Sequence, residues 1–187
     1  PESLKIGDEI RVIAPSLSMK ILSDKTINYA IECFKGMGFK LSFGRHVNEF
    51  DAFGTSSIES RISDLHEAFQ DTNVKAIITA IGGYNCNQLL EYIDWSLISN
   101  NPKIFCGYSD ITILLNAIFS KTGLVTYYGP HFSTFGQKIL DSYTVDYFLQ
   151  TLMKKNTFAI DASKYWSDDK WFIDQENREL KINDGYW

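Results

Sequence analysis

The sequence predicts an α/β protein built on a doubly wound, mostly parallel β-sheet. Two observations lead to this fold class. Short apolar segments alternate with segments whose apolar residues recur at helical spacing, which is the order of elements in repeated β-α units. In addition, residues 74–81 form a run that is apolar apart from Lys75 and Thr79 and stops at Gly82-Gly83, as expected of a strand covered by helices on both faces.

The predicted elements follow one another along the first 153 residues. Five short apolar segments have strand patterns, namely residues 9–14, 40–43, 74–81, 103–106 and 124–127. Five segments have helical patterns, namely residues 24–37, 57–69, 87–93, 111–121 and 145–153. Pro15 closes the first strand, and Gly36 and Gly38 mark the end of the first helix. Ligands of such sheets bind at the carboxyl ends of the strands, so we expect a site at the loops after Ala14, at Gly82-Gly83 and at Ser109.

The character of the sequence changes after Thr157. Trp166, Trp171 and Trp187 stand among polar and charged residues without a helical or strand period. We therefore divide the chain into a domain of residues 1–157 and an aromatic-rich segment of residues 158–187, which is a linker or the start of another domain. We expect this tail to be poorly ordered or ordered through another copy of the chain, with its aromatic surface exposed.

Composition excludes several functional classes. The chain has 187 residues with 18 Lys and Arg against 23 Asp and Glu, and this mild acidity argues against a nucleic-acid polymer as partner. No apolar run is long enough to span a bilayer, so no membrane partner is expected. Cys33, Cys86 and Cys106 are widely spaced and odd in number, which favours reduced thiols and a cytoplasmic protein. Pro1 is not an initiator methionine, which leaves the natural start open.

Ser109 is the first candidate for chemistry. It lies in Gly107-Tyr108-Ser109-Asp110, between a predicted strand and a predicted helix, where a sharp turn would hold its hydroxyl at the carboxyl edge of the sheet. This position suits a nucleophile, although Ile111 replaces the second glycine of the usual hydrolase turn, and the chain offers no obvious base. The alternative is that Ser109, with Asp110, only caps the helix.

Gly82-Gly83-Tyr84-Asn85 is the second candidate. Paired glycines let backbone N–H groups approach a ligand, and one of these together with the Asp110 N–H would form a two-donor oxyanion hole. The alternative is an ordinary turn between a strand and a helix. The pattern matches no known phosphate-binding loop.

The histidines offer little evidence for a base. His46 and His66 are expected to have surface or capping roles, whereas His131 follows Gly129-Pro130 and is expected to contact a substrate or to make a structural hydrogen bond. No set of histidines, cysteines or carboxylates has the spacing of metal ligands, so neither a metal nor a cofactor is predicted.

Several segments together resemble a known family, the serine carboxypeptidases that include the LD-carboxypeptidases of murein recycling and the microcin C self-immunity hydrolases. The matching segments are Leu4–Ile10, Ile13–Ser16, Ala80–Asn85, Gly107–Asp110 and Tyr127–His131. The tail, which ends in Asn183–Trp187, resembles the microcin-immunity branch. The resemblance implies a class I glutamine amidotransferase-like or flavodoxin-like three-layer sandwich.

The resemblance also implies roles for individual residues. Ser109 would be the nucleophile, and the N–H groups of Gly83 and Asp110 would form the oxyanion hole. Tyr84, Asn85, His131 and Trp187 are expected to bind the substrate. Family members complete a Ser-Glu-His triad with residues from a C-terminal domain, and both lie beyond this chain. The implied substrate is a small peptide or a peptidyl or aminoacyl nucleotide, and the implied whole enzyme is a homodimer.

Two rival functions remain open at this stage. The first is a non-catalytic α/β domain that holds a small ligand at the Gly83 and Ser109 loops. The second is an amidotransferase-like hydrolase, but that class has a cysteine at the turn, and Cys106 stands three positions before Ser109.

Overall fold

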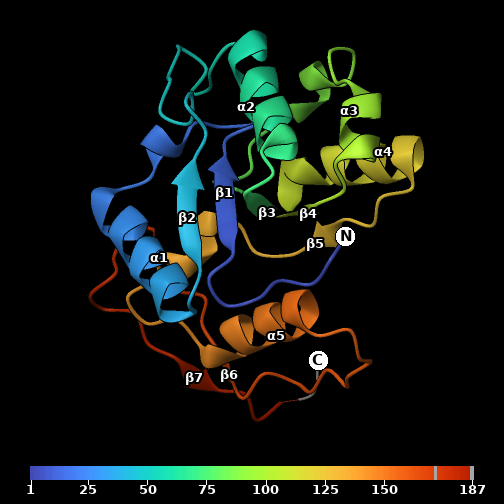
Figure 1. The fold of residues 1–187 in the computed structure, drawn as a ribbon. Coiled ribbons are helices and arrows are strands. Elements are labelled where there is room, and N and C mark those ends of the chain that lie inside the picture. The colour runs from blue at the N-terminus through green and yellow to red at the C-terminus, as the bar shows by residue number, and fades with distance from the viewer. Residues whose placement is uncertain (171, 186–187) are drawn as a thin grey trace.

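A computed structural model describes residues 1–170 and 172–185. Five parallel strands form one sheet in the order β2-β1-β3-β4-β5 (Figure 1). The strands are β1 (Glu9–Ile13), β2 (Lys40–Phe43), β3 (Val74–Thr79), β4 (Ile104–Gly107) and β5 (Tyr127–Tyr128). This order is the flavodoxin-like one, and the predicted doubly wound parallel sheet is confirmed. The chain runs from β1 to β2 at one edge and then crosses to the other side of β1 to form β3. The direction in which strands are added therefore switches between β1 and β3.

Helices cover both faces of the sheet. They are α1 (Asp24–Gly36), α2 (Ile58–Gln70), α3 (Trp95–Asn100), α4 (Thr112–Thr122) and α5 (Ser142–Met153). One core cluster joins α1 and α5 to one face, and a second joins α2, α3 and α4 to the other (Figure 1). In β3, Ile78 belongs to the first cluster and its neighbour Ile77 to the second. The apolar strands are therefore apolar because both of their faces are buried.

Side chains cap the first turns of α1, α2, α3 and α5. Ser23 accepts a hydrogen bond from the Thr26 N–H at 3.2 Å, and Ser57 accepts one from the Ser60 N–H at 3.1 Å. Each such cap typically contributes about 1 kcal/mol. The prediction of one helix over residues 87–93 was wrong. The chain there forms a short 3-10 turn (Cys86–Leu89), and Asp94 then caps α3 through the Leu97 N–H at 3.0 Å.

The fifth strand is shorter and later than predicted. Residues 124–127 were expected to be extended, but β5 comprises only Tyr127 and Tyr128, which pair with Cys106 and Gly107 of β4. Leu124 is buried in the core without belonging to a strand. Its apolar character therefore reflects packing against the helices and not strand pairing.

The described part of the tail has more regular structure than expected. Tyr165–Trp166 (β6) and Lys181–Ile182 (β7) form an antiparallel ribbon. Gln175 is buried, and it donates a hydrogen bond to the Gly136 carbonyl at 2.8 Å and accepts one from the Lys138 N–H at 3.0 Å. These contacts dock the tail onto the first 157 residues within a single copy of the chain. Trp171 and Trp187 lie outside the described residues.

No helix within residues 1–170 and 172–185 is long and apolar enough to cross a membrane.

Candidate active site

Ser109 occupies a strained turn at the carboxyl end of β4. Its φ angle is 59°, in the left-handed region, and it is the only residue other than glycine with a positive φ in the described part of the chain. A 3-10 turn (Ser109–Ile111) begins at once and leads into α4. A left-handed conformation costs about 1–2 kcal/mol for a residue with a Cβ, and such strain tends to occur at active sites. Ser109 is exposed, and its hydroxyl makes no hydrogen bond with any described residue.

Gly82 brings the end of β3 against Ser109. A Cβ atom on Gly82 would lie 3.2 Å from Ser109 Oγ and 3.3 Å from His131 Nε2. A side chain at this position would therefore occupy the space beside the serine hydroxyl. The three loops that were predicted to meet at this edge of the sheet are in contact, since the Leu17 N–H also donates to the Gly82 carbonyl at 3.2 Å.

Gly83 allows the loop after β1 to approach closely. A Cβ on Gly83 would lie 2.2 Å from Ser16 Oγ and 3.1 Å from the backbone nitrogen of Leu17. Neither the Gly83 N–H nor the Asp110 N–H donates to any atom of the described residues. One of these two unpaired N–H groups belongs to the residue after Ser109, and the other belongs to the residue after Gly82, whose added Cβ would lie 3.2 Å from Ser109 Oγ. An oxyanion hole is made of such donors.

The Asp110 carboxylate ties the three loops together. One of its oxygens, Oδ2, accepts hydrogen bonds from Ser16 Oγ at 2.7 Å, from the Asn85 N–H at 2.8 Å and from the Cys86 N–H at 2.9 Å. Burial by itself would raise the pKa of Asp110, but these hydrogen bonds outweigh it and leave the pKa below its ordinary value. The carboxylate is therefore charged at neutral pH and fixes the two glycines relative to Ser109.

Arg61 of α2 makes hydrogen bonds to the loops after β1 and β3. It is buried, and its guanidinium donates to the carbonyls of Pro15 at 3.2 Å and Asn85 at 3.3 Å and to the Gln88 side chain at 2.7 Å. Burial lowers its pKa from the ordinary value. Sequence reasoning missed this role. The only available signal was an arginine in the first turn of a helix that otherwise packs onto the sheet.

His131 lies beneath Tyr108 with one nitrogen unpaired. The side chain is 2% exposed, its ring stacks on Tyr108 with a centroid separation of 4.1 Å, and Nδ1 lies 2.8 Å from Thr79 Oγ1. Nε2 has no hydrogen-bond partner among the described residues. Burial lowers the pKa of His131 to about 4, so the ring is neutral at physiological pH.

The other predicted substrate-binding residues lie in different surroundings. Tyr84 is 64% exposed at the rim, where its hydroxyl donates to the Phe53 carbonyl at 2.6 Å. Asn85 is buried, and its side-chain oxygen accepts from Ser16 Oγ at 3.1 Å, so it is part of the loop scaffold. Trp187 lies outside the described residues.

The remaining histidines have structural contacts. His46 Nδ1 lies 2.8 Å from Asp64 Oδ1, and His66 Nε2 accepts a hydrogen bond from the Asp94 N–H at 3.0 Å. No group of three or more potential metal ligands occurs in the part of the chain that the structure describes.

The cysteines are free thiols that are poorly suited to nucleophilic attack. Cys106 lies inside β4, and burial raises its pKa to about 12. Burial, followed by the nearby Asp110 charge, also raises the pKa of Cys86. A buried protonated thiol is inert, so neither residue takes the place of a cysteine at the turn.

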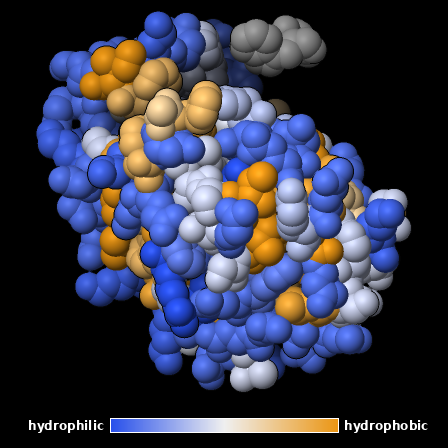
Figure 2. Space-filling model, turned by 90° about the horizontal axis from the view of Figure 1, so that it is seen from above, coloured by the Kyte–Doolittle hydropathy of each residue, from blue (hydrophilic) through white to orange (hydrophobic). Residues whose placement is uncertain are grey.

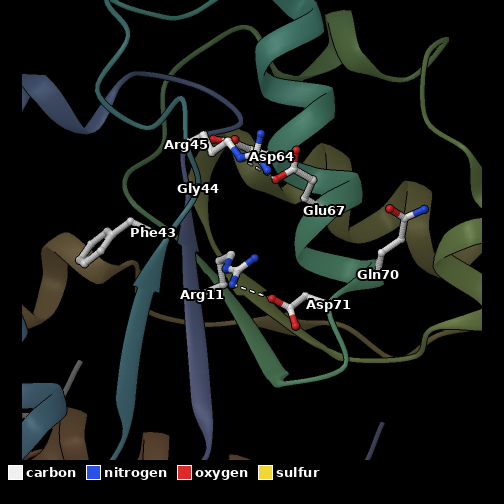
Figure 3. Close-up of a pocket in the computed structure, with 8 residues that line it drawn as sticks. All are labelled: Arg11, Phe43, Gly44, Arg45, Asp64, Glu67, Gln70 and Asp71. Carbon is white, nitrogen blue, oxygen red and sulfur yellow. Dashed lines mark hydrogen bonds and ion pairs between the residues drawn. The ribbon is translucent and has the colours of Figure 1, made fainter.

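Figure 2 views the molecule from the side toward which β1 and β2 point in Figure 1, and it shows apolar patches among a mostly polar surface. A cavity of about 630 Å³ lies elsewhere, between α2 and the strands β1 and β2 (Figure 3). Arg11 pairs with Asp71 at 2.8 Å across this cavity, and Arg45 pairs with Glu67 at 3.4 Å. None of its lining residues belongs to the Ser109 site.

These features define a class of protein: an α/β domain of flavodoxin-like topology with a serine at a strained turn and a paired-glycine loop beside it. Residues 10–129 match the family described as the LD-carboxypeptidase N-terminal domain. The chain therefore belongs to this family.

Individual relatives agree with this assignment. YocD of Bacillus subtilis, named as a carboxypeptidase, is 53% identical over 97% of this chain and 56% of its own length. The microcin C7 self-immunity protein MccF of Escherichia coli is 32% identical over 89% of this chain and 49% of its own length. The chain thus spans about half the length of the curated relatives that it matches.

Solved structures give the same result. An MccF-like protein from Bacillus anthracis superimposes with a TM-score of 0.96 at 56% identity, covering 99% of this chain and 56% of that protein. A structure of MccF in complex with glutamyl sulfamoyl guanosine superimposes with a TM-score of 0.90 at 30% identity, covering 98% and 57%. The relatives thus include carboxypeptidases and microcin-immunity proteins.

Proposed function

We propose that this chain is the nucleophile-bearing part of a serine carboxypeptidase that hydrolyses an amide bond next to a terminal carboxylate. The observation that carries the proposal is the geometry at Ser109. Ser109 is exposed on a left-handed turn, its hydroxyl has no hydrogen-bond partner among the described residues, and Gly83 and Asp110 each offer an unpaired N–H. Acyl transfer needs a nucleophile and donors that stabilise the oxyanion, and this chain holds a candidate for each of these two parts.

The mechanism follows from these groups. Ser109 Oγ attacks the substrate carbonyl carbon, and the carbonyl oxygen becomes an oxyanion that accepts hydrogen bonds from the Gly83 and Asp110 N–H groups. Losing one such donor costs about 3–4 kcal/mol of transition-state stabilisation in comparable sites. A base must remove the hydroxyl proton and deliver it to the leaving amine. The family resemblance supplies that base as a histidine, oriented by a glutamate, from outside this chain.

Two substrate classes fit the relatives. One is a murein L,D-peptide, as the family description suggests, and the other is a peptidyl or aminoacyl nucleotide, as the sulfamoyl nucleotide bound to MccF suggests. We propose that Tyr84 lines the substrate at the rim, that Asn85 acts through the loop scaffold and that Trp187 contributes from the tail. We also expect a cytoplasmic enzyme that is a homodimer at full length.

The test is made on the whole protein that contains this chain. Turnover of an L,D-tetrapeptide and of an aspartyl-adenylate amide analogue is measured for the wild type, for Ser109→Ala and for Ser120→Ala, a matched exposed serine on α4. We expect Ser109→Ala to lose at least about a thousandfold in kcat on the preferred substrate, and Ser120→Ala to match the wild type. Undiminished turnover by Ser109→Ala would overturn the proposal, and tight binding of either compound without turnover would favour a non-catalytic ligand-binding domain.

A further inference from the structure

His131 Nε2 is a buried polar atom with no partner, beside the proposed nucleophile. It and Ser109 Oγ lie 3.3 and 3.2 Å from the same point, the position that a Cβ on Gly82 would occupy. Buried nitrogens of this kind are rare because each costs about 1–3 kcal/mol when it lacks a hydrogen bond. The side chain is held in place by the Tyr108 ring on one side and by Thr79 at its other nitrogen.

The contact with Thr79 determines which nitrogen carries the proton. Thr79 is fully buried, and its hydroxyl has no partner among the described residues other than His131 Nδ1, at 2.8 Å. If Nδ1 carried the proton, the Thr79 hydroxyl proton would be left buried without an acceptor. If the Thr79 hydroxyl donates to Nδ1, both groups are satisfied, and the proton of the neutral ring then resides on Nε2.

This protonation state excludes His131 as the base for Ser109. A ring nitrogen that already carries a proton has no lone pair with which to accept the Ser109 proton, and a second proton on the ring would have to go to Nδ1 and would charge the ring. Burial disfavours that charge, and it lowers the pKa of His131 to about 4. A neutral Nε2–H is instead a hydrogen-bond donor, and it lies 3.3 Å from the position that a Cβ on Gly82 would occupy, which is also 3.2 Å from Ser109 Oγ.

We propose that His131 is a substrate-positioning residue whose neutral Nε2–H donates a hydrogen bond to a substrate oxygen beside Ser109, and that Thr79 sets the tautomer that makes this possible. The substrate oxygen belongs to a carbonyl or carboxylate group, since both accept from a neutral N–H. The inference rests on the proposed function and deepens it, because it assigns the recognition of one substrate oxygen to this domain.

The first test determines the tautomer of His131 and needs no activity measurement. Nitrogen NMR of ring-labelled histidine in the whole protein at pH 7 reports which imidazole nitrogen is protonated, and His131→Phe identifies the signal. We expect a neutral ring with the proton on Nε2 in the wild type and in Thr79→Ser, and loss of this fixed state in Thr79→Val. A proton on Nδ1, or a charged ring, in the wild type would overturn the proposal even if the enzyme is a serine carboxypeptidase.

The second test measures kcat and KM for two variants of His131. His131→Gln retains an N–H donor near the same place, whereas His131→Phe keeps the ring stack without a donor. For the phenylalanine variant we expect kcat/KM to fall roughly 10- to 100-fold, with partial rescue by glutamine. A pair of substrates that end in a carboxylate or in a carboxamide tells which oxygen His131 contacts. If His131→Phe lowers kcat/KM only for the carboxylate substrate, the contact is with the terminal carboxylate. If it lowers kcat/KM equally for both substrates, the contact is with the carbonyl of the bond that is cleaved. Wild-type kcat/KM in a folded His131→Phe would refute the assignment, whereas inactivity of the wild type on all substrates would refute the proposed function instead.

Discussion

Replacing Arg61 by methionine should destabilise the protein strongly, although Arg61 does not take part in the chemistry. The substitution keeps much of the side-chain volume but removes the donors that hold the Pro15 and Asn85 carbonyls and Gln88. Each buried carbonyl that loses its donor costs about 1–3 kcal/mol, and removing a buried charge returns part of that cost. We therefore expect a net loss of about 3 kcal/mol, a large share of the 5–15 kcal/mol typical of a domain.

The assay is urea unfolding monitored by circular dichroism, with Arg45→Met as the matched control. Arg45 is exposed, and its ion pair among the described residues is with Glu67, so its loss should cost less than about 1 kcal/mol. Arg61→Lys keeps the charge but has fewer donors, so its loss of stability should lie between those of Arg61→Met and Arg45→Met. If Arg61→Met fails to fold, Arg61→Lys is compared with Arg45→Met instead. Equal stability of the Arg61→Met and Arg45→Met variants would show that the buried guanidinium does not hold the loops as described.

Three further predictions concern the loops, His131 and the chain on its own. Gly83→Ala should lower kcat at least about 100-fold, because its Cβ would collide with Ser16 and Leu17, whereas Gly36→Ala, with open space around it, should be silent in the same assay. His131 has a pKa of about 4 when folded and an ordinary value of 6.5 when unfolded, so the unfolded state binds more protons between those values. His131 alone should therefore lower the free energy of unfolding by about 3 kcal/mol as the pH drops from 7 to 4. Urea titrations at a series of pH values should show this decrease in the wild type and not in His131→Phe. The 187-residue chain alone should fold but show almost no turnover of either substrate, because the proposed histidine base lies outside it, and full turnover by it would contradict the proposed mechanism.

The fold could be predicted because its signals are local. The apolar run that ends at Gly82-Gly83 is buried on both faces as β3, and alternating strands and helices leave few arrangements other than a parallel sheet. The errors arose where two local signals competed. Leu124 is apolar because it packs in the core, and the helix predicted over residues 87–93 overlooked Asp94, whose capping side chain could have revealed the start of α3.

The candidate site could be predicted only in part. The position of Ser109 follows from the strand and helix on either side of it, but its left-handed backbone has no sequence signal, since serine rarely adopts that conformation. The contacts of Asp110 with Ser16 and of Arg61 with Pro15 join residues that are far apart in the chain. Such contacts depend on the strand order and cannot be read from spacing.

The most direct test of the proposed nucleophile is to find the residue that becomes covalently modified. The whole protein is mixed with its preferred substrate, which would leave an acyl group, or with a fluorophosphonate, which would leave a phosphonyl group with loss of fluoride. It is then quenched with acid and mapped by peptide mass spectrometry, in parallel with Ser109→Ala and Ser120→Ala. We expect one adduct per chain on Ser109, present in Ser120→Ala and absent from Ser109→Ala. An adduct on Cys106 or on any other residue, with turnover intact, would contradict the proposal.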